Sequence, residues 1–141
     1  MHSQTEAVFH AVRSIREAKT DSSLGIRSFG SWKVYKYEAH RFVEFMIGNG
    51  RASLLDTASV HDDMAMYLEE RLAHYIERKR SRQTMETILS ALGKFEYAIN
   101  HYIEIHALEI PRLDTELLRM DFYTRSRKLL RKSSKLFDNR A

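Results

Sequence analysis

The sequence predicts an all-helical protein, a compact bundle of four main helices preceded by a short N-terminal helix. Only five glycines and one proline occur in 141 residues, which is few for a strand-rich fold with many turns. Apolar residues recur at steps of three and four along most of the chain, the spacing of one side of an amphipathic helix. No run approaches the roughly 20 apolar residues that a membrane-spanning helix needs, so none is expected.

The longest periodic stretch is expected to form a central helix over residues 81–108. Its apolar stripe consists of Met85, Ile88, Leu89, Leu92, Phe95, Ile99, Ile103 and His106. Ser81 can accept hydrogen bonds from free backbone N–H groups of the first turn, which marks the start. Pro111 lacks an amide proton and fixes its own φ, so the helix should have ended by Ile110. Other helices must cover the single apolar side.

Three helices are expected before the central one, and a polar connector joins the first two, over residues 5–19 and 28–47. Gly48 and Gly50 should end the second of them, because glycine readily takes the positive φ of a helix C-cap. The apolar stripe of this helix is Trp32, Tyr35, Ala39, Phe42, Val43 and Met46.

The next helix is expected over residues 59–78. Ser59 followed by Asp62 is close to a capping box, and an acidic first turn suits the positive end of the helix dipole. Asp62 and Asp63 point to different sides of a helix, so they are interpreted as solvated charges and not as an acid–base pair. The expected apolar stripe is Met64, Tyr67, Leu68, Leu72, Tyr75 and Ile76.

The last helix is expected over residues 115–137, capped by Asp114 or Thr115, with a thinner stripe of Leu118, Phe122, Leu129 and Leu136. Residues 112–141 hold nine basic and four acidic side chains, whereas the preceding residues are close to neutral. Basic ends of this kind usually contact phosphate. The basic residues of 125–135 could grip DNA, lie on an anionic membrane, or begin a linker to a further domain.

The sequence offers little to support catalysis. Without cysteine there are no disulfides, thiolate ligands or thiol nucleophiles, and no glycine-rich phosphate loop occurs. Glu70 and His74 can share a helix face, but two ligands without a third do not predict a metal site. We therefore expect no enzyme activity, catalytic residue, metal or cofactor in this chain. With no signal peptide at the N-terminus, the expected location is cytoplasmic.

Two helix starts share a pattern. Ser28 and Ser31 are followed by Tyr35 and an apolar stripe, and Ser81 and Thr84, at the same spacing, are followed by Leu-Ser-Ala-Leu and an aromatic residue. In order and spacing, residues 28–111 resemble the SAM-like core-binding domain of tyrosine recombinases, the phage integrases. Ser31 replaces the usual threonine, and Gly93 stands where arginine or lysine is common.

The resemblance implies that residues 28–111 clasp duplex DNA while a separate domain cuts the strand. Residues 1–27 would be an N-terminal helix and connector, and 112–141 a basic helix or linker toward a catalytic domain that is absent here. The family's nucleophilic tyrosine and its arginines do not follow the match. His10-Ala-Val-Arg13 has the spelling of the family's His-x-x-Arg, but it lies upstream and is interpreted as chance.

In such domains, helix starts bring free N–H groups and hydroxyls toward phosphate, and lysines and arginines supply the charge. The residues expected to contact DNA are Ser31, Lys33, Lys36, Arg78, Lys79, Arg80, Arg82, Thr84, Lys94, Arg125, Lys128, Arg131 and Lys132. The expected partners are double-stranded DNA and other recombinase protomers, without a small-molecule substrate or a membrane. The alternative is a helical protein–protein interaction module that binds no nucleic acid, with the stripe of residues 115–137 packed on a partner.

Overall fold

The computed structural model describes residues 4–7, 10, 29–51, 53–77 and 82–138. Side chains within the long helices are described from Lys33, from Met85 and up to Leu129. The four long helices are α2 (Phe29–Gly48), α3 (Thr57–Glu77), α4 (Arg82–Ile105) and α5 (Glu116–Asp138). These ranges contain no strand, so the all-helical fold class is confirmed. Of the expected helix over 5–19, residues 4–7 and 10 are helical, and the rest lies outside the described residues.

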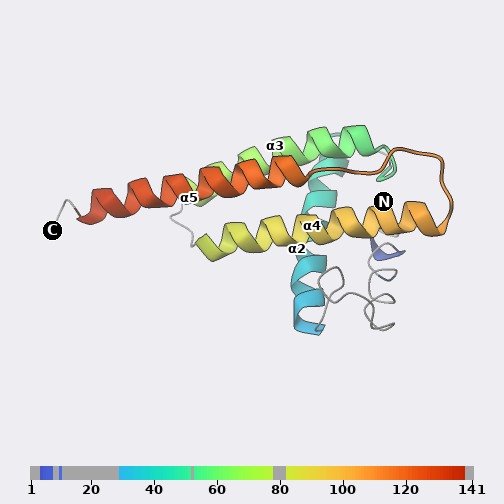
Figure 1. Cartoon of the computed structure of the whole chain (residues 1–141), viewed down its shortest axis with the longest axis horizontal. Helices are drawn as coiled ribbons and strands as arrows, with labels where there is room; N and C mark the ends of the chain where they lie inside the picture. The colour runs from blue at the N-terminus through green and yellow to red at the C-terminus, as the bar shows by residue number, and fades with distance from the viewer. Residues whose placement is uncertain (1–3, 8–9, 11–28, 52, 78–81, 139–141) are drawn as a thin grey trace.

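Three helices lie roughly side by side and the fourth crosses them. In Figure 1, α5 lies between α3 and α4. The helices α3 and α5 run in the same direction and α4 runs opposite to them, while α2 crosses this layer steeply. The packing agrees with the view, because α5 contacts α3 and α4 while α2 also contacts both of these helices. In the described part of the chain, no helix has the length and apolarity needed to cross a membrane.

The core lies where α2 crosses the layer. Phe42 of α2 packs edge-to-face on Phe95 of α4, with ring centroids 5.6 Å apart, and at a tilt on Tyr67 of α3, 5.2 Å away. Phe122 of α5 is also buried, so all four helices contribute to one core. Most members of the expected stripes are buried. Ile76 is not: it is 46% exposed, and its placement in the α3 stripe was wrong.

Two helices end in the same backbone motif. At the end of α2, Gly50 donates to the carbonyl of Ile47 (2.9 Å) and Arg51 donates to that of Met46 (3.0 Å). This pair of hydrogen bonds is a Schellman motif, and it requires a left-handed residue after the helix. Gly50, with φ of 83°, is that residue, as the sequence predicts, and Gly48 is the last helical residue.

The end of α4 has a different cause from the one expected. Ala107 donates to Glu104 (3.1 Å) and Leu108 donates to Ile103 (3.0 Å), again a Schellman motif, with Ala107 at φ of 50°. The helix therefore ends at Ile105, well before Pro111. The placement of His106 in the apolar stripe was wrong, because it follows the helix and is exposed.

The start of α3 also differs from the prediction. Asp56 is the N-cap: it accepts from the N–H of Ser59 (3.3 Å) and from the Ser59 hydroxyl (2.8 Å). The expected cap at Ser59 was wrong, since the helix begins at Thr57. The prediction that Asp63 is solvated was also wrong. Its carboxylate is 1% exposed and accepts two hydrogen bonds from the Arg51 guanidinium, at 2.6 and 3.2 Å.

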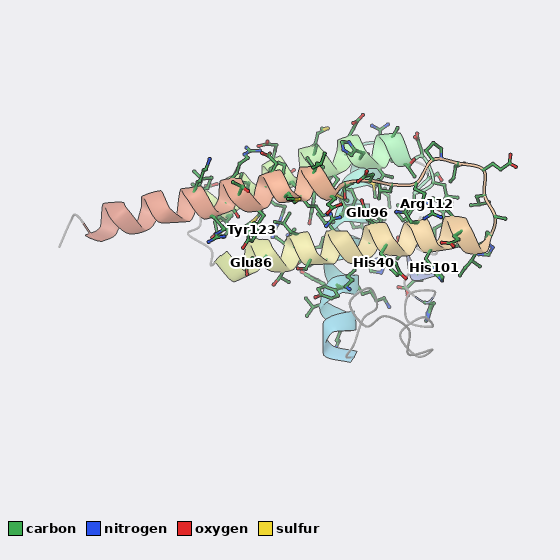
Figure 2. All side chains as sticks on the ribbon, viewed as in Figure 1. His40, Glu86, Glu96, His101, Arg112 and Tyr123 are labelled. Atoms are coloured by element: carbon green, nitrogen blue, oxygen red, sulfur yellow. The ribbon has the colours of Figure 1, made fainter. Side chains whose placement is uncertain are left out.

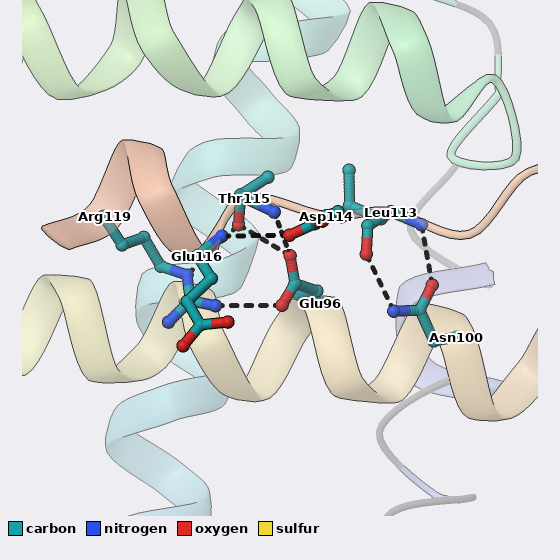
Figure 3. A network of polar contacts seen from close by, with 7 residues as sticks. All are labelled: Glu96, Asn100, Leu113, Asp114, Thr115, Glu116 and Arg119. Atoms are coloured by element: carbon teal, nitrogen blue, oxygen red, sulfur yellow. Dashed lines mark hydrogen bonds and ion pairs between the residues drawn. The ribbon is translucent and has the colours of Figure 1, made fainter. Parts of the chain in front are cut away.

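A polar network fixes the start of α5 against α4 (Figure 3). Glu96 accepts from the backbone N–H and hydroxyl of Thr115 and forms an ion pair with Arg119 at 2.9 Å. One helical turn further along α4, Asn100 exchanges two hydrogen bonds with the backbone of Leu113, at 2.7 and 2.8 Å. The carbonyl of Thr115 accepts the first helical bond of α5, from Arg119 (2.9 Å).

Gly93 makes room for this anchor. A Cβ at Gly93 would lie 2.9 Å from the nearest guanidinium nitrogen of Arg119. Arginine or lysine, the residue types common at this position in the recombinase pattern, would compete with Arg119 for the same space. The glycine thus follows from how α5 packs on α4.

Candidate nucleic-acid interface

The basic half of α5, residues 125–135, is the densest positive segment of the described chain. It holds six lysines and arginines, and no aspartate or glutamate occurs between Phe122 and Phe137. Figure 1 shows that this end of α5 extends past the end of α3 and the start of α4. The bundle therefore holds the first half of α5 and the start of the basic half, where Ser126 is buried and Leu129 packs on the core, while the end of the helix lies beyond it.

Arg125 stands where the basic half leaves the bundle. Its guanidinium donates twice to Glu69 of α3, at 2.7 and 3.1 Å, and lies over the ring of Phe122 at 4.5 Å. These hydrogen bonds raise the pKa of Arg125 and lower the pKa of Glu69. A second carboxylate, Asp121, lies 3.6 Å away. Arg125 is thus arranged to join α5 to α3, and phosphate would have to compete with Glu69 for it.

The remaining basic residues of α5 are better placed for an external ligand. Lys128 is exposed, and Arg127 extends over the ring of Tyr123 at 5.5 Å. The backbone of Arg131 and Lys132 belongs to the same helix, while their side chains lie outside the described residues. Helical periodicity places residues 128, 131 and 132 on one side of α5, since they are three and four apart.

The expected contacts on α2 and α4 are more dispersed. Lys33 is exposed, whereas Lys36 forms an ion pair with Glu6 at 3.0 Å. Burial raises the pKa of Glu6, but hydrogen bonds from Lys36 and His40 outweigh it, and the net pKa is lowered. Lys94 is half-buried on α4. Lys36 is therefore already paired with a carboxylate, and Lys94 is only partly accessible to a ligand.

The remaining expected contacts belong to helix starts and the turn before α4. Ser31 lies in the first turn of α2, and Arg82 and Thr84 lie in the first turn of α4, but their side chains are outside the described residues. Arg78, Lys79 and Arg80 lie outside them entirely. Figure 1 places the two helix starts apart from each other.

A groove of about 690 Å³ between α2 and α3 was not anticipated from the sequence. It mixes carboxylates and guanidiniums, so it does not extend the positive surface. The only signal in the sequence was a pair of mixed charges on each helix, Glu38 with Arg41 and Glu70 with Arg71. Nothing in the spacing shows that these pairs face each other. Among the residues with known placement, no three His, Asp or Glu side chains could hold a metal ion together.

Comparison with known proteins gives no relative: no family model matches the chain, and no curated protein or solved structure is significantly similar. The resemblance to a recombinase core-binding domain stays a prediction.

Proposed function

We propose that this chain is a DNA-binding module that contacts the phosphates of duplex DNA mainly through the basic half of α5. The observation that carries the proposal is the arrangement of charge on this helix. Six basic residues follow one another without an intervening acid, on a helix whose end extends beyond the rest of the bundle. No comparable positive segment lies on α2, α3 or α4 within their described bounds.

The physical basis of such binding is electrostatic. Lysines and arginines that neutralise phosphates release condensed counterions, and the affinity then falls linearly in log–log plots against salt. An α-helix also fits the width of the DNA major groove, so an extended basic helix can approach phosphates on both of its sides. Arg125 would contribute indirectly, because its pairing with Glu69 sets the direction in which the basic half leaves the bundle.

Two further features support DNA as the ligand. The helix starts at Ser31 and at Arg82–Thr84 offer free N–H groups and positive dipole ends, which favour phosphate. The order of motifs over residues 28–111 resembles a recombinase core-binding domain. In this proposal the chain itself catalyses nothing and acts in the cytoplasm, and a longer parent protein could be a site-specific recombinase whose protomers assemble on DNA.

The test is duplex-DNA binding by fluorescence anisotropy across a salt series, with two single variants that each remove one exposed positive charge. Lys128→Ala removes a charge from the basic half of α5. Arg112→Ala removes one from the loop before α5, and Figure 2 shows Arg112 apart from Tyr123 along the layer, on the side away from the end of α5. We expect Lys128→Ala to lower affinity several-fold and reduce the salt slope by about 0.9, the value for one phosphate. Arg112→Ala should leave both nearly unchanged.

Equal effects of the two variants would show that net charge, and not the basic half of α5, governs binding. Absence of binding even at low salt would overturn the proposal. Anionic vesicles measured in parallel separate DNA binding from attraction to any phosphate surface.

The alternative is a helical protein–protein module, and one observation favours it. The α5 stripe that was expected to meet a partner does not, because it packs on the protein's own core, with Phe122 buried. On another side of α5, however, Leu117 is 81% exposed and Met120 is 57% exposed, beside a shallow groove that includes Tyr123. If this surface mediates association, Leu117→Glu should reduce the association measured by analytical ultracentrifugation, and DNA binding should be unaffected.

A further inference from the structure

A second candidate site lies in the groove between α2 and α3, which we name the α2–α3 groove. Its walls include Glu38 and Arg41 of α2 and Tyr67 and Arg71 of α3, and Met85 and Ile88 of α4 provide apolar contacts. Its volume of about 690 Å³ falls within the range of small-molecule sites in proteins.

Buried polar atoms line this groove without hydrogen-bond partners. Tyr67 is only 4% exposed, and its hydroxyl has no partner among the described groups. The same holds for Nε of Arg71 and Oε2 of Glu38. Such atoms are uncommon in folded proteins, since leaving them unpaired costs stability. Three of them on facing helices, around one groove, indicate a site that a polar ligand completes.

Both walls of the groove carry both signs of charge. Glu38, Glu44 and Arg41 lie on α2, and Glu70 and Arg71 lie on α3. Burial raises the pKa of the Tyr67 hydroxyl, and the carboxylate of Glu38 raises it further, so this hydroxyl is neutral and can both donate and accept. A ligand of one sign would be attracted by some of these groups and repelled by the others.

We propose that the α2–α3 groove binds a small zwitterion of the amino-acid class with an apolar side chain. The carboxylate of the ligand would pair with Arg71, its ammonium would pair with Glu38, and its side chain would contact Met85 and Ile88. The Tyr67 hydroxyl would complete the hydrogen bonding between the two charged groups. This site is separate from the basic half of α5 and does not depend on DNA binding.

The charge pattern separates this ligand from the obvious alternatives. A phosphate-bearing ligand would meet the carboxylates of Glu38 and Glu70, and a purely apolar ligand would leave the buried polar atoms of Tyr67 and Arg71 unpaired. Only a ligand with both charges satisfies both walls at once. The site thus predicts a specificity that can be measured with three closely related compounds.

The experiment is calorimetric titration of the full chain with L-phenylalanine, 2-phenylethylamine and 3-phenylpropionate. The last two share the ring but lack the carboxylate and the ammonium respectively. We expect L-phenylalanine to bind, and each analogue to bind at least about 10-fold more weakly, since one buried charged group loses its partner. Equal binding of all three would indicate a merely apolar site, and absence of binding at millimolar L-phenylalanine would overturn the proposal.

Variants place the binding in the groove. Tyr67→Phe keeps the ring that packs on Phe42 and Phe45 but removes the hydroxyl, and should weaken binding of L-phenylalanine by about 3- to 10-fold. Met66→Gln changes the neighbouring, exposed position of α3 and should leave binding unchanged. Equal affinity in Tyr67→Phe and the parent chain would show that the ligand sits elsewhere. Because DNA affinity is measured separately, either proposal can fail alone.

Discussion

Ala107 holds a backbone conformation that favours glycine. Its φ of 50° lies in the left-handed region, where the Cβ of an L-residue crowds the backbone. The Schellman motif at the end of α4 imposes this conformation, because the hydrogen bonds of Ala107 and Leu108 close only around a left-handed residue. Gly50 occupies the same position at the end of α2. The left-handed residue of a Schellman motif is therefore a glycine at one helix end and an alanine at the other.

Ala107→Gly should therefore increase the free energy of unfolding by about 1 kcal/mol, because it relieves the crowding at positive φ. The matched change is Gly50→Ala, which introduces the same crowding and should lower it by a similar amount. Urea denaturation of both variants measures the two effects. If Ala107→Gly destabilised the protein, the left-handed conformation at this residue would be refuted.

Residues of this kind explain where sequence reasoning succeeded and where it did not. Gly50 was expected to end α2, because glycine at such a position is a local signal. Ala107 carries no such signal, so the sequence predicts a helix end from Pro111 alone, and the expected helix is three residues longer at this end than α4. Asp63 was misinterpreted since its partner, Arg51, lies on a preceding loop that the periodicity of α3 does not describe.

At the scale of elements, the start of α3 depends on a single cap. Asp56 accepts from Ser59 twice, and these hydrogen bonds lower the pKa of the Asp56 carboxyl below its ordinary value of 3.8. A carboxyl with a lowered pKa in the folded state contributes stability above its unfolded pKa. That contribution is lost as the pH falls through the folded-state pKa.

Asp56→Ala should reduce stability at neutral pH and remove part of its decline in acid. Asp56→Asn is the informative partner, because asparagine also caps helices well but does not titrate in this range. We expect it to retain most of the stability at neutral pH and to lose less stability than the parent chain as the pH falls. Thermal melts between neutral pH and about pH 3 provide the measurement. If both variants lost as much stability in acid as the parent chain, Asp56 would be excluded as a cause of that loss.

The anchor of α5 is a second feature of this scale. Glu96 and Arg119 are both mostly buried, with 15% and 21% of their side chains exposed, and Thr115 donates to the same carboxylate. Glu96→Ala should lower the free energy of unfolding by about 1–3 kcal/mol, because it removes the carboxylate that pairs with Arg119 and leaves this guanidinium only the Thr115 hydroxyl. Hydrogen exchange should show the loss concentrated in the first turns of α5. Glu104→Ala, which removes an exposed partner of Arg112, is the control and should have little effect.

For the whole molecule, the helices and their buried stripes were predictable because apolar residues in each segment recur with the 3.6-residue period of a helix. Which segments face each other is not. The crossing of α2 over α3 brings Glu38 near Tyr67 and Arg71, and this produces a groove that no single stripe reveals. In the same way, the pairing of Arg125 with Glu69 joins positions 56 residues apart in the sequence.

The charge distribution gives a prediction at this scale. The variant Lys128/Arg131/Lys132→Gln should reduce the slope of log affinity against log salt by about 2.7, which is about 0.9 for each of three phosphates. Its melting temperature should stay close to that of the parent chain, because Lys128 is exposed and the end of α5 extends beyond the bundle. A large loss of stability would show instead that the basic half of α5 supports the fold.

Because α5 is held near the contact of Arg125 with Glu69 and its end extends beyond the bundle, the last part of this helix is a lever. The helix from Arg125 to Asp138 corresponds to about 20 Å of length, with the pairing of Arg125 and Glu69 at the fulcrum. A tilt of about 10° at the fulcrum would displace the far end by about 3.5 Å, about one nucleotide step along a strand of duplex DNA. The stiffness of a few hydrogen bonds between α4 and α5, together with the brace from Arg125 to Glu69, thus determines which phosphates the basic half of α5 can reach.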